Sequence, residues 1–190
     1  KRFNSYKNIF STYSDYFHEQ IFKTGNSQAL RYLEQRGINQ NIIKEYNLGY
    51  VPWQNDFYEK IKTKFSDEEI MLTGLFYKND KTNKFVHRFN SRIIFPINNL
   101  IGETIAFGGR IIKESPFAKY INSPETEFYK KGRTVFNLDK AKTLRSETDE
   151  VVIVEGYIDV VSLYAAGIKN VISNSGTALT ETQIELVWKF

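Results

Sequence analysis

Apolar side chains in the first part of the chain recur every three or four residues, which is the period of an α-helix. Ile9, Tyr13, Phe17 and Ile21 follow this spacing and predict a helix over residues 5–24. Ser66-Asp67-Glu68-Glu69 has the pattern of a capping box before another helix. We therefore expect residues 1–74 to form a helical subdomain, with further helices over residues 28–35, 39–46 and 57–65 and a short strand at 48–51.

Residues 75–146 carry the short apolar runs of β-strands, separated by polar turns. Two such runs flank Asn79-Asp80-Lys81-Thr82-Asn83 and predict a hairpin. Residues 92–97 and 104–107 predict two more strands, and Gly108-Gly109 then allows the backbone to bend or to approach a ligand closely. A helix capped by Asn137 is expected to close this strand-rich part and to end near residue 145.

Residues 147–190 have the pattern of a βαβ unit. Val151-Val152-Ile153-Val154 is apolar without alternation, which is typical of a strand buried on both faces of a parallel sheet. Helical spacing begins after Gly156, a second strand is predicted at 168–172, and Thr180 caps a last helix. The expected fold class is α/β, with an α+β N-terminal subdomain before a truncated parallel unit. The start without methionine and the uncapped last helix indicate an internal fragment.

The end of the first predicted parallel strand carries the candidate catalytic chemistry. Open α/β sheets bind ligands at the carboxyl ends of their strands, where Glu155 lies. Asp159 follows one helical turn later, so both carboxylates can face the same space. Oxygen ligands of this kind suit Mg²⁺. A strand-capping Glu and a first-turn Asp favoured by the helix dipole would give the same spacing. The polar loop Ser173–Ala178 follows the second strand and suits metal-bound phosphate, although an ordinary turn between a strand and a helix has the same sequence pattern.

Composition narrows the class of protein. The chain of 190 residues has a net charge of +4 and no cysteine, which excludes disulfides and cysteine-based zinc sites. No apolar run reaches the ~20 residues of a membrane helix, so we expect no membrane contact and a cytoplasmic location. No phosphate-binding P-loop pattern is present.

Cations and aromatic residues alternate in the middle of the chain. Cations bind phosphates and aromatic rings stack on the bases of single strands, so this pattern favours a nucleic-acid partner. A solvated positive face with Glu114, Glu125 and Glu127 as internal partners is the alternative. The residues are Arg88, Arg92, Arg110, Lys113, Lys119, Lys130, Lys131 and Arg133, with Phe107, Tyr120, Phe128 and Tyr129 between them.

Several segments together resemble bacterial DNA primases of the DnaG type, in order and over nearly the whole chain. Residues 154–160 and 175–180 resemble the start of the TOPRIM domain of that family. The basic middle resembles its N-terminal subdomain, and residues 29–38 resemble the helical start. The combination of residues 155–160, which alone are shared with other TOPRIM proteins, with Asn122-Ser123-Pro124-Glu125-Thr126 is highly specific. In the middle of the chain the resemblance is carried by Arg88-Phe89, residues 92–97, Phe107-Gly108-Gly109-Arg110, residues 119–126 and Lys131-Gly132-Arg133.

This resemblance implies synthesis of short RNA primers on single-stranded DNA from ribonucleoside triphosphates, with Mg²⁺ or Mn²⁺. It implies that Glu155 and Asp159 are catalytic residues and metal ligands, and that further aspartate ligands lie beyond Phe190. It also implies that template or nucleotide is held by Arg88, Arg92, Arg110, Lys119, Tyr120, Asn122 and Lys131.

Other implications concern what lies outside the chain. The family's zinc-binding domain and the region that binds the replicative helicase are expected elsewhere, and a monomer is expected. We predict that the fragment alone does not make primers. The alternatives are another TOPRIM enzyme, a topoisomerase or nuclease, and a non-catalytic module that binds single-stranded nucleic acid.

Overall fold

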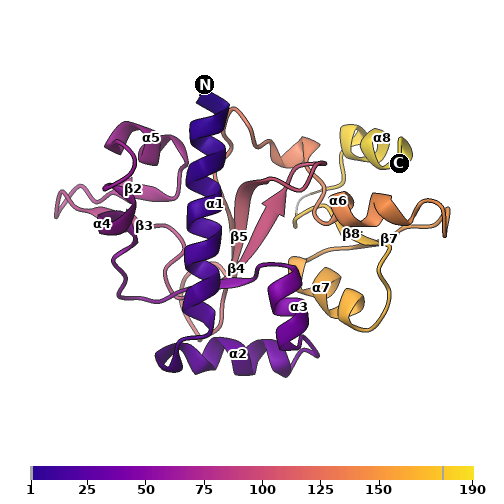
Figure 1. Ribbon diagram of the computed structural model, residues 1–190, viewed down its shortest axis with the longest axis horizontal. Coiled ribbons are helices and arrows are strands. Elements are labelled where there is room, and N and C mark those ends of the chain that lie inside the picture. Colours follow the sequence, from indigo (N-terminus) through magenta and orange to yellow (C-terminus); the bar gives the residue numbers. More distant parts are fainter. Residues whose placement is uncertain (1, 177) are drawn as a thin grey trace.

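The structure is a computed structural model that describes residues 2–176 and 178–190 (Figure 1). Helices form the N-terminal part, strands the middle, and a small parallel unit the C-terminal part. In chain order the elements are α1 (Arg2–Ile21), η1 (Thr24–Asn26), α2 (Ser27–Glu34), α3 (Gln40–Glu45), β1 (Gly49–Val51), α4 (Phe57–Ile61), α5 (Asp67–Leu72), β2 (Phe76–Lys78), β3 (Phe85–His87), β4 (Arg92–Asn98), β5 (Thr104–Ile111), β6 (Tyr120–Asn122), η2 (Lys131–Arg133), α6 (Leu138–Ala141), η3 (Lys142–Leu144), β7 (Val152–Val154), α7 (Tyr157–Ala165), β8 (Val171–Ser173) and α8 (Glu181–Trp188).

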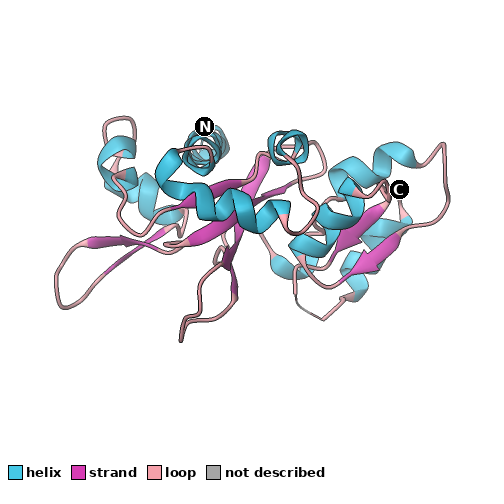
Figure 2. Ribbon diagram, turned by 90° about the horizontal axis from the view of Figure 1, so that it is seen from below, coloured by secondary structure: helices cyan, strands magenta, loops and turns pink. Residues whose placement is uncertain are grey.

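The central sheet has the strand order β1-β4-β5-β6, with every pair antiparallel. The strands β2 and β3 form a separate antiparallel hairpin, which projects from the body in Figure 2. The strands β7 and β8 are parallel and joined by α7. The predicted mixture of helices and strands, with a parallel unit at the C-terminal end, is therefore confirmed.

The alternation of side chains along β4 joins the parts of the molecule. Ile93 and Phe95 enter a hydrophobic cluster shared with Tyr157 and Val161 of α7. Ile94 enters a second cluster, which α1 fills with aromatic side chains. The helix α1 crosses the sheet in Figure 1. The C-terminal unit therefore shares its side of β4 with residues of α2 and α3, whereas most of the buried residues of α1 pack on the other side.

Gly108 allows α7 to dock against β5. A Cβ atom at Gly108 would lie 2.3 Å from Cε2 of Tyr157, so only glycine leaves room for this ring. The same ring stacks on Phe95 with 5.7 Å between ring centroids. Two roles were predicted for Gly108-Gly109, a bend in the chain or a close approach to a ligand. The predicted bend is wrong, because β5 continues through both glycines to Ile111. Both glycines instead admit a neighbouring ring, since Gly109 faces Phe89.

The strand at the start of the parallel unit is more exposed than predicted. The strand β7 begins at Val152, and Ile153 is 47% exposed. Among the described residues β7 pairs only with β8, so neither its free edge nor its outer face is covered. A run of apolar residues predicts burial only where neighbouring layers cover both faces.

Asn137 does not cap the next helix with its side chain, contrary to the prediction. Its backbone is left-handed, with φ of 68°. Its amide accepts from the Tyr46 hydroxyl at 2.9 Å and donates to the Val171 carbonyl at 2.8 Å. Asn137 therefore ties the N-terminal helices to β8, and the predicted helix over 137–145 is divided into the short α6 and η3.

Candidate active site

One cavity gathers most of the predicted site residues. Its volume is about 650 Å³, and it lies where β6, η2 and the carboxyl ends of β7 and β8 meet. Six of the nine predicted site residues line it, and they come from segments far apart in the chain. The lining residues are Arg88, Tyr120, Ile121, Asn122, Lys131, Glu155, Gly156, Tyr157, Asp159, Ser175 and Gly176.

Glu155 and Asp159 are both exposed on this cavity. The Ser173 hydroxyl donates to the Glu155 carbonyl at 3.0 Å and so joins the ends of β7 and β8. Asp159 lies in the first turn of α7, and its side chain folds back toward Gly156. No cation among the described residues forms an ion pair with either carboxylate. The carboxylate oxygens of Glu155 and Asp159 are therefore available to a ligand.

The two acids fit a partial site for a hard divalent cation. Mg²⁺ is commonly bound through one or two carboxylates, with water and substrate phosphates as the other ligands. The part of the chain that the structure describes contains no group of three or more His, Cys, Asp or Glu side chains around one point. Glu155 and Asp159 would thus hold such an ion only together with further oxygen ligands.

Asn122 joins the basic subdomain to the loop after β8. Its amide oxygen accepts from the Tyr157 hydroxyl at 2.5 Å, and its amide nitrogen donates to the Ser175 carbonyl at 3.1 Å. Burial raises the pKa of Tyr157, so the hydroxyl remains protonated and is the donor. Both ends of the Asn122 amide are occupied, so this residue orients the cavity wall. The part of the predicted loop at Thr177 lies outside the described residues.

Lys131 is held in the cavity wall through its backbone. Gln183 is buried and donates from Nε2 to the carbonyls of Lys131 and Thr134, at 2.9 and 2.8 Å. The Lys131 amide donates to Glu125 at 2.9 Å. The predicted capping box of Thr180 and Gln183 is confirmed, and it links α8 to this wall. The Lys131 ammonium has no carboxylate partner among the described ion pairs.

Arg88 forms the side of the cavity nearest the hairpin. Its Nε donates to the Gly74 carbonyl at 2.8 Å, which fixes the guanidinium. The guanidinium carbon lies 5.8 Å from the ring centroid of Tyr77. Arg88 thus combines a cation on the cavity with an aromatic neighbour in β2.

Three predicted site residues do not line this cavity. Arg92 is only 4% exposed and donates to the carbonyls of Lys119 and Ala118, at 3.0 and 2.7 Å. Burial lowers the pKa of Arg92. Arg92 therefore supports the loop before β6. Lys119 is exposed at the end of this loop, and its carbonyl also accepts from Ile111.

Arg110, the third, is enclosed by aromatic rings. Its guanidinium carbon lies 4.4 Å from the centroid of Tyr32 and 5.6 Å from that of Tyr120. It donates to the Ile111 carbonyl at 2.6 Å. Arg110 reaches the cavity only through Tyr120, whose ring it supports. Whether these three residues contact a ligand stays a prediction.

Sequence reasoning missed Tyr157 and Ile121 as cavity residues. Tyr157 lies between the strand-ending Glu155 and the predicted helix, which was the available signal. Nothing local shows that its hydroxyl reaches Asn122, because the two residues are 35 positions apart.

The chain matches the family model described as the DNA primase catalytic core, N-terminal domain, over residues 16–142. The chain belongs to the DNA primase family. A Toprim-like model matches residues 152–190. A DNA primase of Lactococcus lactis is 43% identical over 160 residues, which cover 83% of this chain and 25% of the relative. A DNA primase of Legionella pneumophila is 36% identical over 184 residues, which cover 96% of this chain and 31% of the relative.

Solved primase structures have the same fold. The zinc-binding and RNA polymerase domains of the Aquifex aeolicus primase align with a TM-score of 0.91 and 31% identity, over 100% of this chain and 46% of that one. A DnaG primase catalytic domain bound to single-stranded DNA aligns with a TM-score of 0.87 and 28% identity. The alignment covers 99% of this chain and 61% of that one. The chain spans about a quarter to a third of the length of the curated primases named above. No described helix is both long and apolar enough to span a membrane.

Proposed function

We propose that this protein contributes to the RNA polymerase core of a DNA primase, which makes short RNA primers on a DNA template by nucleotidyl transfer. The observation that carries the proposal is the cavity whose lining includes two carboxylates and two cations. Glu155 follows β7 and Asp159 lies in α7, whereas Lys131 lies in η2 and Arg88 follows β3. Membership of the primase family supports the same reaction class.

Each group has a chemical role in this proposal. Lys131 and Arg88 bind phosphate oxygens of the template or of the incoming ribonucleotide. Tyr120 is 39% exposed and offers a ring for a base. Asn122 and Tyr157 hold the loop at Ser175 in position. Glu155 and Asp159 would hold Mg²⁺ or Mn²⁺, which neutralises charge developing on phosphate when bound.

The bonds made and broken follow from the reaction class. A 3′-hydroxyl of the growing primer attacks the α-phosphate of a ribonucleoside triphosphate, and pyrophosphate leaves. The proton of the hydroxyl passes to a base, a role that a carboxylate on this cavity can fill. The excess of negative charge on the triphosphate is balanced by the cations of the cavity wall.

The wider biological setting is also part of the proposal. The partners would be single-stranded DNA and ribonucleoside triphosphates, with a replicative helicase bound through another region of the protein. The protein would act as a monomer at the cytoplasmic replication fork. The single-stranded DNA named for a structurally similar DnaG catalytic domain supports the template assignment.

Substitution of the acids tests the catalytic part. In the full-length protein, Glu155→Gln and Asp159→Asn should each lower primer synthesis at least about a hundredfold and weaken Mn²⁺ binding in calorimetric titration. Glu185→Gln, on the exposed side of α8, is the matched control and should have no effect. Primer synthesis by Glu155→Gln at the unsubstituted rate would overturn the proposal.

A second candidate is a non-catalytic module that binds single-stranded nucleic acid. It is favoured by one observation, the absence of a third acidic ligand near the cavity among the described residues. Both candidates require Lys131→Ala to weaken DNA binding and to reduce the salt dependence, by a slope of about 0.7 per lost phosphate contact. Only the enzyme requires Glu155 for Mn²⁺ binding.

A further inference from the structure

The outer side of the β2–β3 hairpin has features that neither the fold nor the cavity requires. Phe76 is buried against the core, whereas Tyr77, on the opposite face of β2, is 43% exposed. Tyr77 pairs with Val86 across the hairpin, and no described residue covers its ring in a stacked contact.

Arg88 connects this ring to the cavity. The guanidinium that lies 5.8 Å from the Tyr77 centroid is also part of the cavity lining. The backbone ladder of the hairpin extends to Arg88, whose amide donates to the Leu75 carbonyl at 2.8 Å. Tyr77 therefore lies just beyond the edge of the cavity, on a backbone that is paired and fixed.

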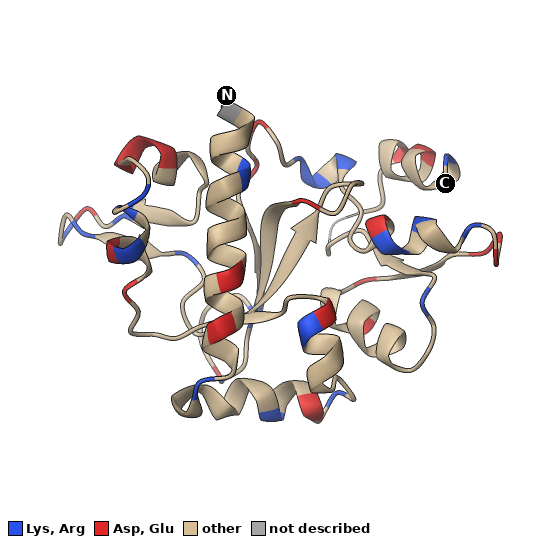
Figure 3. Cartoon of the chain, in the orientation of Figure 1, with Lys and Arg blue, Asp and Glu red and all other residues tan. Residues whose placement is uncertain are grey.

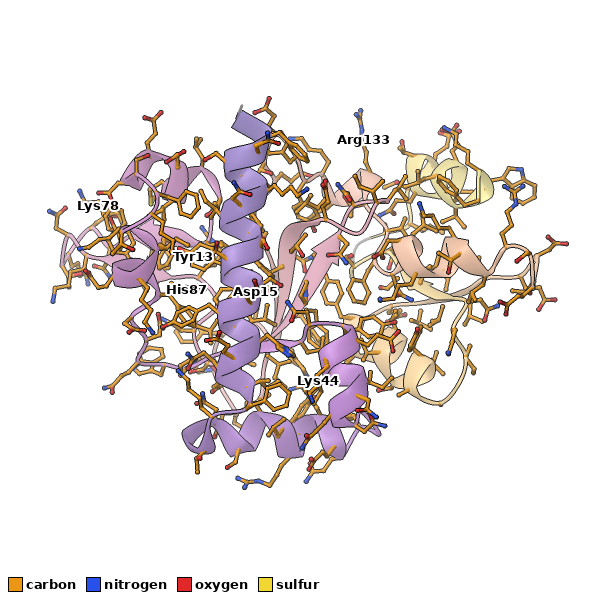
Figure 4. The ribbon with its side chains drawn as sticks, viewed as in Figure 1. Tyr13, Asp15, Lys44, Lys78, His87 and Arg133 are labelled. Carbon is orange, nitrogen blue, oxygen red and sulfur yellow. The ribbon has the colours of Figure 1, made fainter. Side chains whose placement is uncertain are left out.

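The charge of the hairpin favours a polyanion. Lys78, Lys81 and Lys84 are exposed, and Asp80 is the one acid between them. No ion pair among the described residues involves these lysines. Figure 3 shows the cations of this projecting segment, and Figure 4 shows the Lys78 side chain directed away from the body.

We infer that Tyr77 is a stacking platform for a base of the single-stranded template immediately outside the cavity, with Arg88 binding the adjoining phosphate. The inference rests on the proposed function and extends it by one binding site. A base has a π-face that any aromatic ring can accept, so this contact is independent of sequence. The hairpin lysines add attraction for the phosphates that follow.

Oligonucleotide length separates the platform from the cavity. Oligothymidylates of about 4 and about 12 nucleotides span the usual range of single-strand sites. Tyr77→Ala should weaken binding of the longer oligonucleotide about tenfold in fluorescence anisotropy and leave the shorter one unchanged. Tyr77→Phe and Tyr77→Trp keep a ring and should bind both lengths as before.

Two further measurements make the test specific. The fluorescence of Tyr77→Trp, after subtraction of the unsubstituted protein, should be quenched by the longer oligonucleotide and not by the shorter. Trp188→Ala removes an 88% exposed ring from α8, at the opposite end of the molecule in Figure 1, and should change neither affinity.

The outcomes distinguish the platform from the proposed function. If Lys131→Ala weakens both lengths while Tyr77→Ala weakens neither, the cavity binds DNA and the platform is refuted. If Lys131→Ala and Arg88→Ala leave both affinities unchanged, the proposed function fails, and the platform fails with it. A length-dependent loss in Tyr77→Ala that Tyr77→Phe restores supports both.

Discussion

At the scale of single residues, the side-chain amide of Asn122 is both donor and acceptor between two parts of the molecule. It accepts from Tyr157 and donates to the carbonyl of Ser175. Exchange of the NH₂ group for an oxygen therefore places two acceptors against each other. This makes the asparagine distinguishable from an aspartate of nearly the same shape.

Asn122→Asp should lower the free energy of unfolding by about 1–3 kcal/mol, since the donor to Ser175 is lost and the carbonyl faces a like partial charge. Tyr157→Phe removes only the hydroxyl and should cost about 1 kcal/mol. Urea unfolding of the two variants gives both numbers. Equal stability of Asn122→Asp and the unsubstituted protein would show that the amide does not hold the loop.

His87 is a second residue with a measurable signature. It is buried among the rings of Tyr13, Phe17, Phe57 and Phe76, and its Nδ1 accepts from the Phe89 amide at 3.0 Å. Figure 4 labels it beside α1. Burial, with the charge of Arg88, lowers the pKa of His87 from 6.5 to about 3. The imidazole is therefore neutral in the folded protein.

Because the folded pKa is depressed, the unfolded chain takes up a proton below about pH 6.5 that the folded protein does not. The free energy of unfolding should then fall by about 2 kcal/mol from pH 7 to pH 5 through this residue. The loss continues as the pH approaches 3. His87→Asn keeps an acceptor for Phe89 but does not titrate, so its stability should fall about 2 kcal/mol less over the same interval. Parallel pH profiles of the two proteins would refute this.

At the scale of elements, the contact between β5 and α7 depends on the absence of a side chain. Gly108→Ala should lower the free energy of unfolding by about 1–3 kcal/mol, because the new methyl group overlaps the Tyr157 ring. Gly25→Ala is the control: its Cβ would meet nothing within 4 Å, and it should stay within about 0.5 kcal/mol. Thermal or urea unfolding compares the two. An equal effect of both variants would exclude close packing as the cause.

The elements that could be predicted from the sequence are those that local chemistry determines. The capping boxes at Ser66 and Thr180 form as their spacing predicts, because both partners lie within one turn. The hairpin and the parallel βαβ unit also form as predicted. The burial of β7 could not be predicted, since burial depends on which layers lie beside a strand.

The candidate site was predictable to a lesser degree. Charge and residue type identified Arg88, Lys131, Glu155 and Asp159, which the fold brings to one cavity. The same criteria could not distinguish Arg92 from the cations that line the cavity. Its guanidinium donates instead to the carbonyls of Ala118 and Lys119. Those acceptors lie 26 and 27 positions away, so no local spacing rule connects them with Arg92.

At the scale of the whole molecule, one hydrophobic cluster includes residues of both the sheet and the C-terminal unit. Ile93 and Phe95 of β4 share it with Tyr157 and Val161 of α7. The proposed boundary between residues 146 and 147 therefore does not separate two independent cores. Units that share a core are expected to unfold together.

The two tryptophans of the chain report on this cooperativity. Trp53 lies in the N-terminal part and Trp188 in α8. Trp53→Phe and Trp188→Phe each leave one reporter, and their fluorescence should give the same midpoint of urea unfolding. A lower midpoint for the protein that keeps only Trp188 would mean that the C-terminal unit unfolds first.

The fit of the Tyr157 ring over Gly108 also has an evolutionary consequence. In any relative that keeps this packing, a residue larger than glycine at 108 requires a side chain smaller than tyrosine at 157. The smaller side chain would lack the hydroxyl that donates to Asn122. Position 122 would then no longer need an acceptor for that hydroxyl and could change as well. Substitutions at positions 108, 122 and 157 should therefore be correlated across the family.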